Sequence, residues 1–371
     1  MKKIAILGAS KPHLPLFLKA KEMGLETYCI AWAQGAFCKD YADHFHDISI
    51  TDKEAIADLC SREHIDGIIS NALEPAVPVM AYVHEICGLN GISVETARRC
   101  TDKKLMRICI RDSKACMQPD FEIYDPNKCI SIRMPLIVKP TDSSCSNGVT
   151  KVTTPDELGN ALGRAMEASS NGEILIEECI EGAEVSVESI SFKGEHHILT
   201  ITDKETTGSP YFVETAHHQP SHFPAELQAE IKDNVKRILN AIGIDNGASH
   251  AEFKITPEGK VYFIEIGARG GGDFISYELV RLSTGYDYVK GMIECALGTF
   301  KKPVFGPQKH SGVYFLSEET SYIRDFILNN QNQPWVYDFH MDNGPLRSLR
   351  KSQDRSGWII YNSDHKIEIN R

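Results

Sequence analysis

This chain of 371 residues lacks the sequence features that mark three classes of protein. No uninterrupted apolar run approaches the roughly 18 residues of a membrane-spanning helix, so we expect no membrane partner. The 11 cysteines form no C-x-x-C pair and no cluster at zinc-ligand spacing. The G-x-x-x-x-G-K-[ST] loop is absent as well. These absences argue against a membrane protein, a zinc-stabilised fold and a P-loop enzyme.

Positive charge is also in short supply, because 51 acidic residues outnumber 40 lysines and arginines and give a net charge of -11. Affinity for a nucleic-acid backbone depends on lysine and arginine, so we expect no nucleic-acid partner. The first apolar run, from Ile4 to Leu7, is too short for a signal peptide. An odd number of scattered cysteines fits a reducing compartment. The sequence therefore predicts a cytoplasmic protein.

Two patterns divide the chain, whose length suggests roughly two to three domains. Residues 1–96 alternate short β-rich runs with helical patterns, which is typical of βαβ units in a parallel sheet. A helix is then predicted over residues 95–113, followed by short strands, a set of antiparallel strands after residue 184 and a helix over residues 224–243. We predict an α/β domain at residues 1–96, then an α+β part in two lobes, residues 97–184 and 185–371.

A small polar loop follows a buried-looking strand that ends at Lys139. The loop contains Ser143, Ser144, Cys145, Ser146 and Gly148. The backbone N–H groups and hydroxyls of such a loop can enclose a triphosphate while the lysine neutralises its charge. A solvated hairpin loop with an incidental lysine is the alternative, and this segment alone does not decide between the two.

An acidic segment covers residues 177–188 between two predicted strands. Exposed backbone there can pair with the edge of adenine, and a later carboxylate can accept hydrogen bonds from a ribose. Taken alone, the segment fits a solvated acidic hairpin better.

The most informative residues are Glu252 and Glu265, one on each arm of a predicted hairpin with the turn TPEGK. Antiparallel pairing places the two carboxylates side by side, which is unfavourable unless a cation lies between them. Magnesium is bound in phosphoryl-transfer sites by one or two carboxylates together with substrate phosphates. Arg269 follows, just before three glycines, and can hold a phosphate with two parallel hydrogen bonds. An edge hairpin with a flexible glycine tail is the alternative, but it does not explain a lone glutamate inside an apolar strand.

These motifs, taken in order, resemble the ATP-grasp superfamily over nearly the whole chain. They are DK at 102–103, VKP at 138–140, EECIEGAEVSVE at 177–188, HAEF at 250–253 and IEIGARGGG at 264–272. The βαβ start resembles the domain that precedes the ATP-grasp module in biotin carboxylase, carbamoyl-phosphate synthetase and D-alanine–D-alanine ligase. The resemblance implies a pre-ATP-grasp domain followed by a two-lobed ATP-grasp module. It also implies an ADP-forming ligase that uses ATP and Mg²⁺, with Mn²⁺ as the substitute ion, to join a carboxylate to an amine through an acylphosphate.

The resemblance further implies a role for each matching residue. Two lysines, Lys103 and Lys139, contact the nucleotide phosphates, and residues 143–148 form a loop that covers them. Adenine meets Glu177, Glu178, Cys179 and Ile180, the ribose meets Glu184, and the γ-phosphate meets Lys204. The magnesium carboxylates are Glu252 and Glu265, and Arg269 steadies the transferred phosphate and the acyl intermediate. No enzyme nucleophile is needed, so Cys145 is read as a loop residue.

One position departs from the family pattern. Many members carry Glu-x-Asn-x-Arg at the metal strand, with the asparagine as an additional ligand, and this chain has Gly267 in its place. The form IEIGARGGG is more similar to the branch that contains bacterial L-amino acid ligases. Water or another group must then complete the metal coordination.

Two other functions and several lesser candidates remain open at this stage. The alternatives are a bicarbonate-using carboxylase or carbamoyl-phosphate-synthase-like enzyme and a non-catalytic ATP-binding protein. Candidates for substrate contact are His217, His218, His250 and Glu74. The expected partners are a small-molecule carboxylate and an amine, and a homodimer is the commonest assembly.

Overall fold

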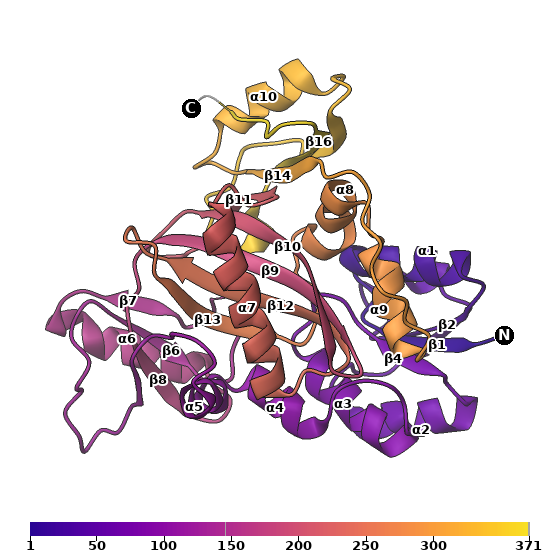
Figure 1. The fold of residues 1–371 in the computed structure, drawn as a ribbon, viewed down its shortest axis with the longest axis horizontal. Coiled ribbons are helices and arrows are strands. Elements are labelled where there is room, and N and C mark those ends of the chain that lie inside the picture. Colours follow the sequence, from indigo (N-terminus) through magenta and orange to yellow (C-terminus); the bar gives the residue numbers. More distant parts are fainter. Residues whose placement is uncertain (145, 370–371) are drawn as a thin grey trace.

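The computed structural model describes residues 1–144 and 146–369, and these residues form three β-sheets (Figure 1). The interpretation of Cys145 falls outside the described residues. The first sheet is parallel and has the strand order β3-β2-β1-β4. Its strands are β1 (Lys3–Leu7), β2 (Glu26–Ala31), β3 (His44–Asp47) and β4 (Gly67–Ile69). The predicted βαβ start is confirmed, although β3 was not predicted because its sequence, HFHD, is polar and largely exposed.

Helices cover both faces of the parallel sheet. On one side of the sheet, α2 (Lys53–Glu63) packs against α3 (Ala76–Cys87). On the other side, α1 (Leu14–Glu22) packs against α9 (Tyr288–Ala296). Tyr288, Met292 and Ile293 of α9 share a buried cluster with Ile4 and Phe17. A helix from the second half of the chain therefore completes the N-terminal domain and ties it to the rest (Figure 1).

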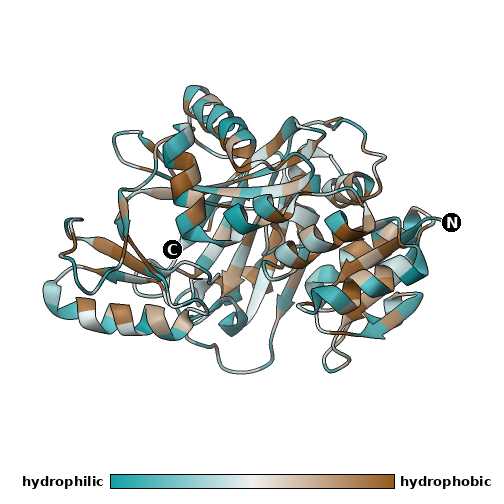
Figure 2. Ribbon diagram, turned by 90° about the horizontal axis from the view of Figure 1, so that it is seen from below, coloured by the Kyte–Doolittle hydropathy of each residue, from teal (hydrophilic) through white to brown (hydrophobic). Residues whose placement is uncertain are grey.

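The second sheet is antiparallel and forms the small lobe at the lower left of Figure 1, in the order β5-β8-β6-β7. Its strands are β5 (Phe121–Ile123), β6 (Leu136–Pro140), β7 (Thr150–Val152) and β8 (Ile174–Glu178). Helix α6 (Pro155–Ala168) packs on it through Ala161 and Ala165, which are fully buried with Val138 and Ile176. Most of the other residues of α6 are exposed, and the helix, at the lower left of Figure 2, carries both hydrophilic and hydrophobic colours along its length.

The third sheet is antiparallel and has eight strands in the order β13-β12-β9-β10-β11-β14-β16-β15. They are β9 (Ala183–Phe192), β10 (Glu195–Thr206), β11 (Glu214–Gln219), β12 (Gly247–Ile255), β13 (Val261–Gly267), β14 (His310–Leu316), β15 (Val336–Met341) and β16 (Gly357–Ser363). Helix α7 (Ala225–Ile242) buries Val235 and Leu239 in one cluster with Val187 and Phe253 of the sheet. Polar side chains occupy the opposite face of the sheet, so that face can bind a ligand or take part in a reaction. The shorter elements after β13 are η3 (Ile275–Leu279), α8 (Val280–Thr284) and α10 (Tyr322–Asn330).

The mixed α/β fold class is thus confirmed, and the predicted strands and the hairpin β12–β13 are present. The division at residues 96 and 184 stays a prediction. Among the described residues, none of the helices has the length and apolarity that crossing a bilayer requires.

The single helix predicted over residues 95–113 is wrong. The chain forms α4 (Val94–Thr101) and α5 (Lys103–Ser113), because Asp102 between them is extended, with φ -112° and ψ 108°. The Asp102 carboxylate accepts hydrogen bonds from the backbone N–H groups of Lys104 (2.9 Å) and Leu105 (3.2 Å), so it caps α5. The break also lets the Lys103 N–H donate to the carbonyl of Thr141, 2.8 Å away, which brings the start of α5 beside the polar loop.

Candidate active site

A cavity between the small lobe and the eight-stranded sheet gathers most of the predicted site residues. Its lining includes Lys103, Lys139, Ser143, Ser144, Ser146, Glu177, Glu178, Cys179, Ile180, Glu184, Lys204, Glu252 and Glu265. Residues from five separate segments of the chain thus meet in one place. The fold brings them together because β6, β8 and the linker after β8 form one wall, and β9, β10, β12 and β13 form the other.

Glu252 and Glu265 lie directly opposite each other in the β12–β13 register. Each carboxylate has a cation near it: Nζ of Lys204 is 2.7 Å from Glu252, and Nζ of Lys103 is 3.5 Å from Glu265. The ammonium of Lys103 lowers the pKa of the Glu265 carboxyl. Burial raises the pKa of the Glu252 carboxyl, but the neighbouring cations reverse this effect and the net shift is well downward. Both groups are therefore carboxylates at neutral pH and can serve as oxygen ligands.

Lys204 is surrounded by three carboxylates. Besides Glu252, its Nζ atom lies 2.9 Å from Glu184 and 3.4 Å from Glu214, and only 3% of its side chain is exposed. Burial alone lowers the pKa of a lysine, but these three carboxylates raise the pKa of Lys204 well above its ordinary value. The lysine is thus a permanent positive charge in an otherwise acidic part of the cavity.

Lys139 forms a buried ion pair with Glu177. The Lys139 Nζ atom lies 2.5 Å from one oxygen of Glu177, and Nε of Arg107 lies 2.6 Å from the other. Arg107 also donates to the carbonyl of Ile264 in β13, at 2.6 Å, so it links the two lobes. Burial raises the pKa of the Glu177 carboxyl, but the two cations outweigh burial and lower it overall. Glu177 therefore holds Lys139 in place, whereas the sequence suggested an exposed backbone segment here.

The polar loop is held to the start of α5. Nζ of Lys103 donates to the carbonyl of Ser143 at 2.7 Å. Gly148 does not belong to the cavity lining; it has φ +78° and packs at the base of the loop, where a Cβ would lie 2.6 Å from Ala168 and 3.1 Å from Pro140. Glycine is thus required at this position for both its conformation and its lack of a side chain.

Arg269 lies outside this lining and contacts the N-terminal domain. Its Nε atom donates to Glu74 at 2.6 Å, and 17% of its side chain is exposed. Burial lowers the pKa of the guanidinium, but the Glu74 carboxylate outweighs burial and raises it overall. Glu74 is therefore the ion-pair partner of Arg269, and its place at a substrate cleft stays a prediction.

The three candidate histidines have different surroundings. His250 is buried between Glu188, which contacts its Nδ1 atom, and Glu252, whose Oε1 atom lies 3.1 Å from its Nε2 atom. Glu188 also accepts a hydrogen bond from the N–H of Gly271 at 3.0 Å, so it ties the glycine loop to β9. His217 lies on the cavity face of β11, whereas His218 points to the other face and contacts the Tyr361 hydroxyl at 3.0 Å.

The residues present fit a magnesium ion that also binds substrate phosphates. Two carboxylates in register are a usual protein contribution to such a site, and the remaining ligands come from phosphate oxygens and water. Within the described part of the chain, no group of three or more histidine, cysteine, aspartate or glutamate side chains is arranged to hold a metal by itself. A side chain at Gly267 would crowd the ion pair, since its Cβ would lie 3.2 Å from Glu74 and 3.3 Å from Arg269 and both side chains would have to shift by a few tenths of an ångström.

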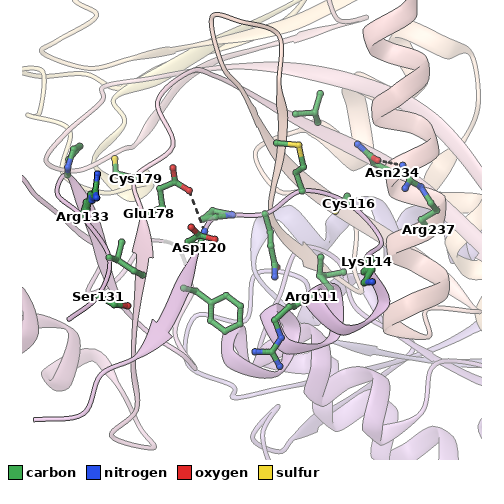
Figure 3. A pocket seen from close by; sticks show the side chains of 18 of the residues that line it. Arg111, Lys114, Cys116, Asp120, Ser131, Arg133, Glu178, Cys179, Asn234 and Arg237 are labelled. Atoms are coloured by element: carbon green, nitrogen blue, oxygen red, sulfur yellow. Dashed lines mark hydrogen bonds between the residues drawn. The ribbon is translucent and has the colours of Figure 1, made fainter. Parts of the chain in front are cut away.

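A larger groove borders the linker that follows β8 (Figure 3). It shares Glu178 and Cys179 with the cavity, and Arg133 and Arg237 stand on opposite sides of it in Figure 3. Arg237 forms an ion pair with Asp233 at 3.0 Å and donates a hydrogen bond to Asn234. The groove contains neither the lysines nor the paired glutamates, so the predicted phosphate-binding and metal-binding residues lie together in the other cavity.

Sequence reasoning missed four residues that shape the site: Arg107, Phe212, Glu214 and Arg355. Phe212 and Glu214 line the cavity, and the alternation in YFVETAHH contained the signal for Glu214. Arg355 lies 2.8 Å from Asp273 and donates to the carbonyl of Glu214 at 2.9 Å. No local pattern in the C-terminal segment indicates these contacts, since they depend on the packing of distant strands.

Comparisons with known proteins agree with this geometry. Residues 132–278 match the family model of the ATP-grasp domain. The chain is 30% identical over 181 residues to D-alanine–D-alanine ligase of Flavobacterium psychrophilum, a match that covers 47% of this chain and 54% of that protein. It is 26% identical over 329 residues to alanine–anticapsin ligase of Bacillus subtilis, covering 72% and 68%. The chain therefore spans only about half the length of the first of these relatives. The crystal structure of L-amino acid ligase from Bacillus licheniformis matches with a TM-score of 0.81 at 23% identity and covers 98% of this chain and 94% of that one, which shows a shared fold.

Proposed function

We propose that this chain, which belongs to the ATP-grasp superfamily, is an ATP-dependent ligase that joins a carboxylate to an amine and releases ADP and phosphate. The relatives named D-alanine–D-alanine ligase and alanine–anticapsin ligase support C–N bond formation as the reaction class. Their own substrates are not transferred to this chain, because the matches cover only part of each relative.

One observation carries the proposal: the register pair Glu252 and Glu265 shares a cavity with three lysines from three other segments, Lys103, Lys139 and Lys204. A carboxylate and a triphosphate repel each other, so their reaction needs concentrated positive charge and a dry site. The three lysines supply that charge, and the two carboxylates supply a place for a divalent ion among them.

In this proposal the nucleotide lies against the linker. Glu178, Cys179 and Ile180 meet the adenine, Glu184 meets the ribose, and the loop at residues 143–148 covers the phosphates. Lys103 and Lys139 contact the phosphates, and Lys204 approaches the γ-phosphate. Closing the loop would exclude water and protect the acylphosphate until the amine attacks.

Glu252 and Glu265 would hold the magnesium ion, with Mn²⁺ as a substitute. When bound, the ion neutralises charge on the transferring phosphoryl group. Arg269 would leave Glu74, at least in part, to hold the transferred phosphate and the acyl group. The Glu74 pair holds the guanidinium where the carboxylates of Glu265 and Glu252 also raise its pKa, so it lies near the proposed metal ligands before substrate arrives.

The decisive experiment is a panel of small carboxylates crossed with amines, followed by phosphate release and the mass of the product. We expect ADP and phosphate only when an acid and an amine are both present, with product mass equal to acid plus amine minus water. Equal phosphate release with bicarbonate alone would contradict the ligase assignment and indicate carboxylation. Nucleotide binding without phosphate release across the panel would indicate a binding protein.

A further inference from the structure

The groove of Figure 3 takes no part in the proposed reaction, although it is larger than the cavity that holds the predicted site residues. Its volume is about 1120 Å³, against about 160 Å³ for that cavity. One wall comes from residues 131–135 of the small lobe, and the other comes from α5 and α7, which pack against each other. The connection at residues 116–121 lies between the walls. We call this space the interlobe groove, and its size suits a ligand larger than a single amino acid.

The interlobe groove and the nucleotide cavity have the linker after β8 in common. Pro119, Glu178 and Cys179 line both spaces. The N–H of Glu178 donates to the carbonyl of Asp120 at 2.8 Å, which holds the linker to the connection at residues 116–121. A ligand in the interlobe groove therefore contacts the segment that the proposed function gives to adenine.

Charged side chains of both signs line the interlobe groove without neutralising one another. Within the described part of the chain no ion pair joins any two of them: the four cations are Arg111, Lys114, Arg133 and Arg237, and the three acids are Asp120, Glu178 and Glu230. Lys114 and Arg133 have no ion pair at all among the described residues. The groove thus has opposite charges available for a ligand, and its cations outnumber its acids in a chain whose net charge is -11.

These charges are separated along the groove. In the view of Figure 3, Asp120 and Glu178 lie between Arg133 on one side and Lys114 and Arg237 on the other. Oε2 of Glu178 accepts a hydrogen bond from the N–H of Asp120 at 3.4 Å, so the two acids form one negative region beside the linker. Exposed charges contribute little affinity each, but charges of opposite sign at separate places fix the orientation of a ligand.

Apolar and sulfur-containing side chains lie among the charges. Cys116, Met117, Ile132 and Met134 line the groove, and 46% of Met117 is exposed. Methionine is flexible and polarisable, and methionine-rich surfaces repack around varied partners, as in proteins that bind many different peptides. The lining therefore suits a ligand with charged ends and an apolar middle.

We propose that the interlobe groove binds a short peptide with free ends, and that this binding is coupled to nucleotide binding through the linker. The ammonium end lies at Asp120 and Glu178, and the carboxylate end lies at Lys114 on α5 and Arg237 on α7. A simple anion would face the two acids and a simple cation would face the four cations, whereas a zwitterion meets both. The proposal goes beyond the ligase reaction, because the site contains none of the three lysines and neither of the paired glutamates.

Four forms of one tripeptide test the two charged ends. Alanyl-leucyl-alanine is compared by calorimetric titration with its N-acetyl form, its C-terminal amide and the form that carries both caps. We expect the free peptide to bind most tightly, and each cap to weaken binding about two- to fivefold, the contribution of an exposed ion pair. Equal binding of the four forms, tighter binding of the N-acetyl form, or no binding would overturn the proposal.

Two variants assign the ends to residues. Asp120→Asn should weaken only the forms with a free ammonium, and Lys114→Gln should weaken only the forms with a free carboxylate. Asp58→Asn on α2 and Lys128→Gln outside the groove are the matched controls, since both side chains are exposed and neither lines the groove. Variants that weaken all four forms equally, or none of them, would place the peptide elsewhere and refute the assignment.

The coupling to the nucleotide is measured with ADP. We expect saturating alanyl-leucyl-alanine to change the Kd of ADP by at least about fivefold, and saturating ADP to change the Kd of the peptide by the same factor, because coupling between two sites is reciprocal. Asp120→Asn should reduce this factor, and Asp58→Asn should not. An unchanged Kd of ADP would overturn the proposal, since a ligand in the groove meets Glu178 and Cys179. A protein that binds the peptide in the expected pattern but binds no ADP would refute the proposed function and leave the peptide site standing.

Discussion

The Nε atom of Arg269 lies 2.6 Å from Oε2 of Glu74, although 195 residues separate the two in sequence. The pair joins the glycine loop to the N-terminal domain. It also explains the glycine at position 267, because a Cβ there would lie 3.2 Å from Glu74 and 3.3 Å from Arg269. Glycine at this position leaves room for the ion pair as it stands, whereas a Cβ would require the two side chains to shift by a few tenths of an ångström.

Replacing Gly267 by alanine should therefore disturb Arg269. We expect kcat/KM to fall about tenfold and the free energy of unfolding to fall by about 1–2 kcal/mol, because the new methyl group meets two side chains that are held by each other. Steady-state kinetics and urea unfolding measure the two effects. Gly159→Ala is a suitable control, since nothing lies within 4 Å of its Cβ on α6 and alanine favours a helix. Wild-type kinetics for Gly267→Ala would mean that Arg269 does not act through this geometry.

Removing one negative charge from the register pair should abolish catalysis and leave the fold intact. In Glu265→Gln we expect ADP release to fall by a factor of about 100 or more, because loss of a metal-binding carboxylate weakens the charge stabilisation of the transferring phosphoryl group. Binding of Mn²⁺ to the protein–ADP complex, followed by electron paramagnetic resonance, should weaken in parallel. Glu258→Gln changes an exposed carboxylate in the turn of the same hairpin and serves as the control. Unchanged turnover in Glu265→Gln would eliminate the metal assignment.

Some residues of the site could be predicted from the sequence, and others could not. Alternation, which is a local pattern, placed Glu252 and Glu265 on facing strands. The resemblance to the ATP-grasp superfamily placed Lys139 and Lys204 with them, and all four line one cavity. The N-terminal parallel sheet followed from local pattern as well. What failed was the single helix over residues 95–113, since the helical pattern continues through Asp102 and only the capping contacts show the break.

Contacts between distant segments could not be predicted in the same way. Nothing in the sequence around Arg107 indicates that its guanidinium is buried between Glu177 and the carbonyl of Ile264. The Arg355–Asp273 pair likewise depends on β14 and β16 joining the sheet beside β11. Tertiary packing determines where such charged side chains lie, and the periodicity of the sequence carries no information about that packing.

A substitution at Lys204 tests whether the three carboxylates around it need a positive charge when no metal ion is bound. Lys204→Met leaves Glu184, Glu214 and Glu252 without their shared counter-charge, so we expect the metal-free protein to lose about 3–5 kcal/mol of stability. Added Mg²⁺ should restore part of that loss, and the magnesium-induced rise in Tm should exceed that of the wild type. Lys254→Met, a more exposed lysine 3.8 Å from Glu184, should show a smaller loss. An identical magnesium response in Lys204→Met and wild type would contradict this account.

The His250–Glu188 pair makes stability depend on pH in a defined direction. Burial lowers the pKa of His250, but the carboxylates of Glu188 and Glu252 outweigh burial and raise it to about 9, against an ordinary value of 6.5. The folded state therefore binds the proton more tightly than the unfolded state does. This contribution, on the order of 3 kcal/mol, is fully present below pH 6.5 and is lost as the pH rises through 9.

In His250→Gln this pH-dependent contribution should disappear. We expect the free energy of unfolding, measured with urea in the presence of EDTA, to decline less steeply than that of the wild type between pH 6.5 and 9. Ser249→Ala removes a neighbouring buried hydroxyl that does not titrate and that pairs with Ser189, so it should lower stability by the same amount at every pH. A wild-type slope in His250→Gln would show that the imidazole is neutral in the folded protein. Glu188 would then lack the cationic partner that, together with the Gly271 N–H, keeps the glycine loop against β9.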